Sequence, residues 1–183
     1  NVPPLVHGVV SGFGVASTIT LPAPLDTTVA IASGLDIVHF SGPGHDGTLG
    51  YGNLGVWGQV YPLERGTGIE PNVSGSIRNN GERPSFSASG YGLGIGLKDD
   101  FLNQFLWAAW YGGAFSELDG KGYVGISEVS RLTVNATLPP ILMPGTKAAD
   151  YDLGWGDLVF SLTYSTQDYD DITVLIYASV IVG

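Results

Sequence analysis

The sequence contains no cysteine, and only 13% of its 183 residues are charged. Without cysteine the chain can form neither disulfides nor thiolate metal sites, and it has no thiolate nucleophile. Seven lysines and arginines against seventeen acidic residues give a net charge of −10. This balance excludes a nucleic-acid-binding protein that relies on neutralising phosphates, and it opposes docking on an anionic membrane surface. No apolar run reaches the roughly 18 residues that predict a transmembrane helix.

Motifs of known catalytic chemistry are also missing. The three histidines are His7, His39 and His45, and no HExxH, P-loop or Gly-x-Ser-x-Gly pattern accompanies them. His39 lies in an apolar stretch typical of a strand. His45-Asp46 lies in a glycine-bounded loop and offers a base with an orienting carboxylate, but no nucleophile. We therefore expect a protein that is not an enzyme, with an uncharacterised hydrolase as the distant alternative.

Glycine is strongly over-represented, at 28 of 183 residues, about twice its usual share. Many glycines alternate with large apolar residues, as in 90–96, and glycines also thin the stretch 50–58. In a strand this spacing leaves one sheet face without side chains. A helix, another strand or a flat apolar ligand could then approach that face closely.

Alternation with a period of two dominates the chain and predicts a mainly β protein. Residues 158–164 and 172–180 form a predicted hairpin around a turn at 165–171. Further strands are predicted at 7–21, 28–33, 35–41, 54–61, 73–78, 85–97, 121–128 and 130–137. We predict one β-rich domain over 1–183, or a fragment of a longer chain, built as an antiparallel curled sheet or sandwich of about 8–10 strands.

The segment 99–111 has the period of a short amphipathic helix instead. The acids at its start complement the helix dipole, Asp99 is a candidate cap, and Gly112-Gly113 ends the helix. One apolar stripe comprises Phe101, Leu102, Phe105, Leu106, Ala109 and Trp110. Trp107 and Tyr111 lie on the other side, where either a loop or sheet covers them or they form an aromatic contact surface.

A strand at 92–97 runs through Lys98 into this helix, which leaves through Gly112-Gly113-Ala114-Phe115. This arrangement resembles the tubular lipid-binding (TULIP; bactericidal/permeability-increasing protein-like) family, in which a strand leads into a Leu-Ser-x-x-x-Leu-Asn helix start and a Gly-Ala/Val-Phe/Leu exit. Here Lys98 replaces the usual small cap. Leu138-Pro139-Pro140 and Gly156-Asp157-Leu158 are similar to bacterial members, so the resemblance covers about residues 85–165.

The resemblance implies a curled antiparallel sheet wrapped around a helix, with a hydrophobic channel for acyl chains. That family pairs two long helices, whereas this chain offers one short helix, so either the chain is a fragment or the resemblance is a local convergence on a strand–helix motif. The ligand-binding residues that the resemblance implies are Tyr91, Leu93, Ile95, Leu97, Phe101, Leu102, Phe105, Leu106 and Trp110.

The stretch 171–183 is apolar on both faces of its predicted strand. An exposed strand of this kind would template aggregation, so we expect it to be central in the sheet, paired with another chain, or cut from a longer protein. The stretch 5–15 is also apolar and rich in glycine. The competing function is therefore a structural subunit of an extracellular filament or surface layer that self-associates by β-strand donation through its terminal strands.

Acidic residues near two turns are candidate calcium ligands, with solvated turn acids as the alternative: Asp150, Asp152, Asp168, Asp170 and Asp171. No other cofactor is indicated.

Sequons at Asn72 and Asn135 matter only in a host that glycosylates exported chains. The cysteine-free, lysine-poor, acidic composition rich in glycine and threonine favours an exported protein, in the extracellular space, at the cell surface or in the periplasm, and the start without methionine indicates a processed or excised chain. We predict a non-enzymatic domain that binds an apolar, lipid-like ligand between sheet and helix, with no nucleic-acid partner.

Overall fold

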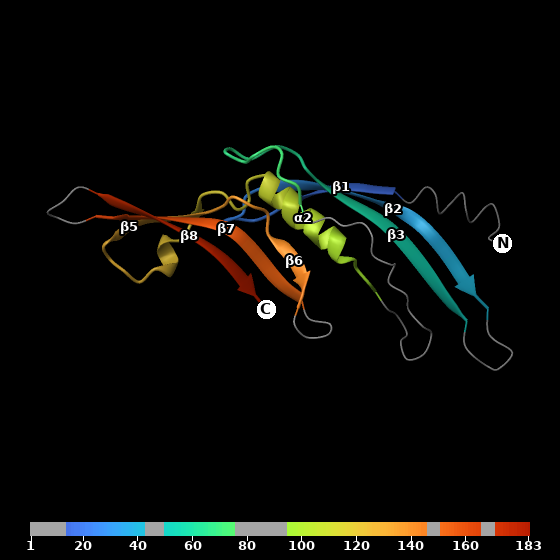
Figure 1. Ribbon diagram of the computed structural model, residues 1–183. Helices are drawn as coiled ribbons and strands as arrows, with labels where there is room; N and C mark the ends of the chain where they lie inside the picture. The colour runs from blue at the N-terminus through green and yellow to red at the C-terminus, as the bar shows by residue number, and fades with distance from the viewer. Residues whose placement is uncertain (1–13, 43–49, 76–94, 146–150, 166–170) are drawn as a thin grey trace.

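The computed structural model describes residues 14–42, 50–75, 95–145, 151–165 and 171–183. Within these ranges eight strands form two antiparallel sheets, and the α-helix α2 (Asp99–Tyr111) lies between them. Figure 1 shows the sheets extending from the helix in opposite directions. The predicted fold class, mainly β with one short helix at 99–111, is confirmed.

The first sheet, sheet A, has the order β1 (Gly14–Thr20), β2 (Thr28–Ser41) and β3 (Tyr51–Pro62). The sequence predicted two strands where β2 is continuous through Gly34. Gly34 pairs with Trp57 of β3, and a Cβ at Gly34 would lie 2.6 Å from Nε1 of that indole. The glycine therefore makes room for a cross-strand ring rather than ending the strand, and the irregularity falls between Leu35 and Ile37, where the register shifts.

The second sheet, sheet B, contains five strands: β4 (Leu118–Asp119), β5 (Val129–Ala136), β6 (Ile141–Pro144), β7 (Tyr151–Tyr164) and β8 (Ile172–Val182). β5 and β6 pair with the two ends of one edge of β7, and β8 pairs with its other edge. The predicted hairpin of β7 and β8 is thus confirmed. The predicted strand at 121–128 is wrong, because the 3-10 helix η1 (Lys121–Tyr123) and a turn occupy it. Residues 73–75 form no strand either; the remainder of the predicted strand 73–78 lies outside the described residues.

The predicted limits of α2 are correct, but its capping differs from the prediction. Lys98 is the N-cap and makes no side-chain cap hydrogen bond, while Asp99 is the first helical residue and its Oδ1 accepts from the Asp100 amide at 3.0 Å. The exit is as predicted: Gly113 takes the left-handed conformation, with φ of 92°, that side chains with a Cβ resist.

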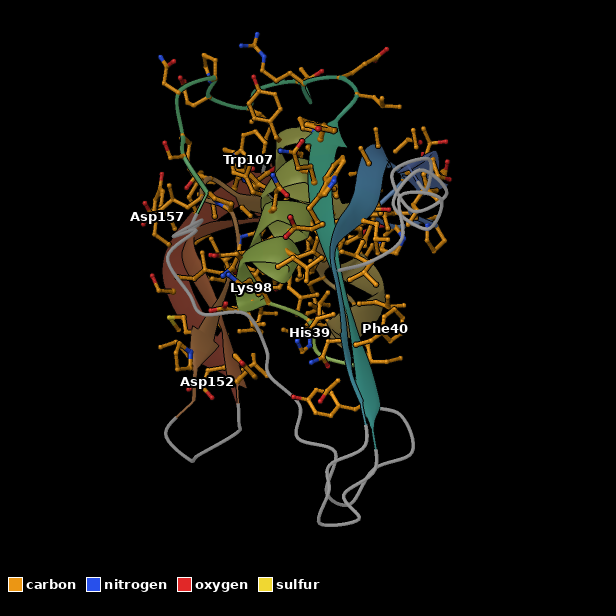
Figure 2. All side chains as sticks on the ribbon, turned by 90° about the vertical axis from the view of Figure 1, so that its right-hand side faces the viewer. His39, Phe40, Lys98, Trp107, Asp152 and Asp157 are labelled. Carbon is orange, nitrogen blue, oxygen red and sulfur yellow. The ribbon has the colours of Figure 1, made fainter. Side chains whose placement is uncertain are left out.

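Two amide side chains of α2 connect the helix to the facing edges of both sheets. Gln104 Oε1 accepts the Val60 N–H of β3 at 3.0 Å. Asn103 makes two bonds to Leu142 of β6: its Nδ2 donates to the Leu142 carbonyl at 3.1 Å, and its Oδ1 accepts from the Leu142 N–H at 2.6 Å. Figure 2 shows the helix between β3 and the strands of sheet B, with Lys98 labelled at its start. The helix thus satisfies backbone groups on both edges that face it.

One core cluster draws residues from sheet A, α2 and sheet B. Its buried members are Val29, Val60, Ile69, Ala108, Ala109, Trp110, Ala114, Phe115, Ala136 and Leu158. Trp110 is the largest fully buried side chain, and its Nε1 donates to the Ala136 carbonyl at 2.7 Å. The two sheets are therefore held together through one apolar centre built on the helix.

The opposite side of α2 is covered by the segment that follows β3. Trp107 and Tyr111 lie with ring centroids 5.1 Å apart. Trp107 Nε1 donates to the Val73 carbonyl at 3.0 Å, and the Tyr111 carbonyl accepts the Gly66 N–H at 2.8 Å. Of the two interpretations of these aromatics, the structure supports a covering loop.

Candidate functional site

An open groove of about 420 Å³ lies where the segment at 73–75 meets sheet B. It is lined by residues from four segments: 73–75, 138–143, 154–156 and 179–181. These belong to the covering loop, the region of β6, the first half of β7 and the end of β8. The volume is within the roughly 300–1,000 Å³ typical of small-molecule sites.

A local interruption of sheet B creates this groove. Pro139 and Pro140 separate β5 from β6, because proline has no N–H for the β7 ladder. Opposite them the β7–β8 register shifts between Trp155 and Leu158, and Asp157 has a left-handed φ of 48°. The Asp157 carbonyl accepts both the Thr137 N–H, at 3.2 Å, and the Thr137 hydroxyl, at 2.8 Å. The strand break and the bulge are thus held together, and the groove opens beside them.

The helix positions the wall of the groove that lies opposite the sheet. A Cβ at Gly75 would lie 2.8 Å from the Trp107 ring, and the Trp107 N–H holds the Val73 carbonyl. The lack of a side chain at Gly75 therefore lets the 73–75 segment lie against the indole. Figure 2 labels Trp107 on α2.

The lining of the groove is almost wholly apolar. None of the thirteen described residues that line it is titratable, and among them only Ser74, Ser179 and Trp155 carry a side chain with an O–H or N–H donor. The Trp155 ring packs edge-on against Phe115, with centroids 5.2 Å apart and planes at 85°. Its Nε1–H is buried and has no acceptor among the described residues. A buried donor without a partner costs about 1–3 kcal/mol, which makes this N–H unusual.

A second, larger cavity of about 1090 Å³ lies near the C-terminal end of α2 and has a different character. Its lining includes the acidic residues Asp26, Glu64, Glu70 and Glu117 together with Arg65. In the described part of the chain, no group of three or more histidine, cysteine or acidic side chains could hold a metal ion. Elsewhere on the surface, the Ser127 hydroxyl donates to Glu128 and lowers the pKa of that exposed carboxyl.

The ligand-binding residues implied by the family resemblance are not gathered in the groove. Tyr91 and Leu93 lie outside the described residues. Ile95, at 87% exposed, and Leu97 precede the helix on the surface. On α2, Leu102 is exposed and Leu106 half-buried, while Trp110 is in the core and Phe101 and Phe105 pack against it. No described member of this set lines the groove.

The candidate calcium ligands are also dispersed where they are described. Asp152 lies in β7, and Asp171 accepts a hydrogen bond from the Ser165 hydroxyl at 2.6 Å just before β8. Asp150, Asp168 and Asp170 lie outside the described residues. Figure 2 labels Asp152 and Asp157 at separate points of sheet B.

Sequence reasoning did not single out the groove residues. The available signal was the pair Pro139-Pro140 between two predicted strands, together with Trp155 between two glycines. A double proline interrupts the hydrogen-bond ladder of a sheet. A tryptophan between two glycines places a large ring next to residues that have no side chain. Nothing in the one-dimensional pattern shows that β6, β7 and the 73–75 segment meet.

Comparison with known proteins returns no match: no family model, no curated protein and no solved structure is significantly similar to this chain. Within the described residues, no helix is long and apolar enough to cross a membrane; α2 itself has 13 residues.

Proposed function

We propose that this protein is a non-enzymatic, exported domain that binds an apolar, lipid-like ligand in the groove between sheet B and the 73–75 segment. The observation that carries the proposal is a groove of ligand size with no titratable side chain among the described residues that line it. Burial of apolar surface then supplies the affinity, at about 0.8 kcal/mol for each methylene removed from water. The resemblance to the tubular lipid-binding family favours the same class of ligand.

The site differs from the one that the resemblance implies. Part of the helix face predicted to contact ligand packs on the sheets, since a Cβ at Gly58 of β3 would lie 2.7 Å from the Phe101 ring, whereas Leu102 of the same face is exposed. The proposed ligand lies on the other side of the covering segment, against Met143, Gly154 and Val180. Met143 is a flexible side chain that can adapt to ligands of varied shape.

A charge placed at Ile181 is expected to abolish ligand retention. Ile181 lines the groove and is 69% exposed, so an aspartate there remains hydrated and costs little folding free energy. It would nevertheless present a charge that an apolar chain must desolvate. Native mass spectrometry of the purified protein, followed by extraction, should find lipid on the wild type and none on Ile181→Asp.

Leu175→Asp is the matched control. Leu175 lies on the same strand, is 53% exposed and does not line the groove. This variant should retain lipid as the wild type does. Wild-type protein that carries no lipid and takes up none from vesicles would refute the proposed function.

A second candidate function, self-assembly by strand addition, is favoured by β8. Among the described residues β8 pairs only with β7, and its eleven residues include no charge and no proline. The other edge of such a strand presents backbone N–H and C=O groups without the charges that usually block further pairing. We infer that a β8 strand from a second copy is the partner that fits this edge.

A lysine at Tyr177, in the middle of β8, is expected to reduce this association to monomer. Tyr177 is exposed, and a charge on an edge strand opposes pairing with another strand. Sedimentation velocity over a concentration series should show dimers or larger species for the wild type only. Val56→Lys adds the same charge to an exposed position on β3 and should leave assembly intact. A wild type that is monomeric throughout would exclude this second candidate.

A further inference from the structure

Met143 carries the only sulfur atom of the chain, which has one methionine and no cysteine. It lies on β6, is half-buried and lines the groove. A Cβ at Gly154 would lie 2.8 Å from Met143 Cε and 3.5 Å from its Sδ. The thioether therefore packs over Gly154, at a position where β7 has no side chain of its own.

The strand register places this thioether on the groove side of sheet B. Gly154 pairs with Ile141 of β6 and with Ile181 of β8, and Met143 shares the face of Ile141, two residues away. Residues that pair across antiparallel strands have their side chains on the same face. Ile181 lines the groove and is 69% exposed, so the face that carries the Met143 thioether is the one that opens to solvent. A small molecule that enters the groove can therefore reach the sulfur.

A thioether that meets a hydroperoxide is oxidised to the sulfoxide. A sulfur lone pair attacks the terminal oxygen of the hydroperoxide, the S–O bond forms and the O–O bond breaks. The sulfur loses two electrons, and the hydroperoxide is reduced to water or an alcohol as the proton of the transferred oxygen moves to the leaving oxygen. The product carries a strong hydrogen-bond acceptor on a side chain that was apolar.

The groove offers little that could compensate for a sulfoxide oxygen. Among its described lining residues the side-chain donors are the hydroxyls of Ser74 and Ser179 and the buried indole N–H of Trp155. The cross-strand partner of Met143 is Asp152, whose carboxylate accepts hydrogen bonds and donates none. The sulfoxide therefore depends on water, and an apolar ligand that covers it must remove that water.

We propose that Met143 is an oxidation site that controls ligand binding: a hydroperoxide converts it to the sulfoxide, the groove then releases its apolar ligand, and reduction of the sulfoxide restores binding. This inference rests on the proposed function and adds a regulatory step at the same site. The step is reversible, because methionine sulfoxide reductases return the sulfoxide to the thioether.

The test measures the affinity of the protein for Nile red, a neutral apolar dye, before and after treatment with hydrogen peroxide. Mass spectrometry of tryptic peptides should locate one added oxygen atom at Met143. The oxidised wild type should bind Nile red about tenfold more weakly, because the dye must cover a polar group that has no partner. Methionine sulfoxide reductases of both stereospecificities should restore the original affinity.

Met143→Leu is the matched control, because leucine keeps an apolar side chain of similar volume without the sulfur. This variant should bind Nile red as the untreated wild type does, before and after peroxide. Met143→Gln places a polar group at the same position and should bind weakly without any oxidant. Circular dichroism should show the native spectrum for the oxidised wild type and for both variants. Loss of the fold on oxidation would assign Met143 a role in the core and overturn the inference.

Two further results on the wild type would overturn the inference while leaving the proposed function standing. In one, peroxide leaves the Met143 thioether intact; in the other, the sulfoxide forms and Nile red binds as before. An equal loss of affinity in peroxide-treated Met143→Leu would have the same meaning, because the responsible group would then lie elsewhere. Untreated wild type that binds no Nile red would overturn both the inference and the proposed function.

Discussion

Replacing Trp110 with alanine is expected to lower the free energy of unfolding by about 3–5 kcal/mol, the usual cost of removing a large aromatic side chain from a core. Trp110 is 1% exposed, and it belongs to the cluster that joins sheet A, α2 and sheet B. The substitution also leaves the Ala136 carbonyl without its donor. Urea unfolding followed by circular dichroism should show a much lower midpoint.

Trp57→Ala provides the comparison for Trp110. Trp57 is 44% exposed and lies across Gly34 on sheet A, so its removal leaves no enclosed cavity. Its effect should be about 1 kcal/mol or less. Equal destabilisation by the two substitutions would contradict a core centred on Trp110.

Local sequence patterns were sufficient to predict α2 and the β7–β8 hairpin. The limits of α2 follow from an acidic start and a glycine pair, which are short-range signals. The hairpin follows from alternation in 158–164, a run of strand-forming residues in 172–180 and the turn between them. In contrast, 121–128 alternates in sequence but is a 3-10 helix and a turn, because its neighbours decide its conformation.

The glycine pattern predicts sheet faces without side chains, but it does not predict which group packs against them. Thin sheet faces were predicted at 90–96 and 50–58; residues 90–94 lie outside the described residues, and in 50–58 aromatic rings of the same chain cover two of the glycines. A Cβ at Gly52 would lie 2.7 Å from the Phe40 ring, and one at Gly58 would lie equally close to the Phe101 ring. Gly34 of β2 meets Trp57 in the same way, as does Gly75, outside the sheets, with Trp107. An aromatic ring that packs over a glycine buries apolar area at a position where glycine has no side chain to bury.

The groove could not be predicted, because it depends on contacts between distant parts of the chain. It requires the break at Pro139-Pro140, the bulge after Trp155, and the 73–75 segment held by Trp107. Some of these segments lie far apart in the sequence: Val73 and Trp107, for instance, are separated by 34 residues. The strand period of two residues and the helix period of 3.6 residues carry no information about such long-range contacts.

The stability of the groove is linked to the helix through Asn103. This side chain is 4% exposed and is bonded twice to Leu142, between two residues that line the groove, Ile141 and Met143. Its amide acts toward β6 as another strand would, since it satisfies one N–H and one C=O of the same residue. Gln104 makes a single, partly buried bond to Val60 on the opposite side.

Asn103→Ala is therefore expected to lower the free energy of unfolding by roughly 2–4 kcal/mol, because it leaves two backbone groups of Leu142 unpaired. Gln104→Ala should cost about 1 kcal/mol, since it removes one bond. Hydrogen exchange, corrected for the change in global stability, gives the local readout: Asn103→Ala should speed exchange of the Leu142 amide and spare Val60, and Gln104→Ala should do the reverse. If either substitution speeds both amides equally, the helix does not hold the two sheet edges through separate contacts. Asn103→Ala should also weaken ligand retention while Gln104→Ala preserves it. Asn103 is bonded to β6, which lines the groove, whereas Gln104 is bonded to β3, none of whose residues is among the described lining residues.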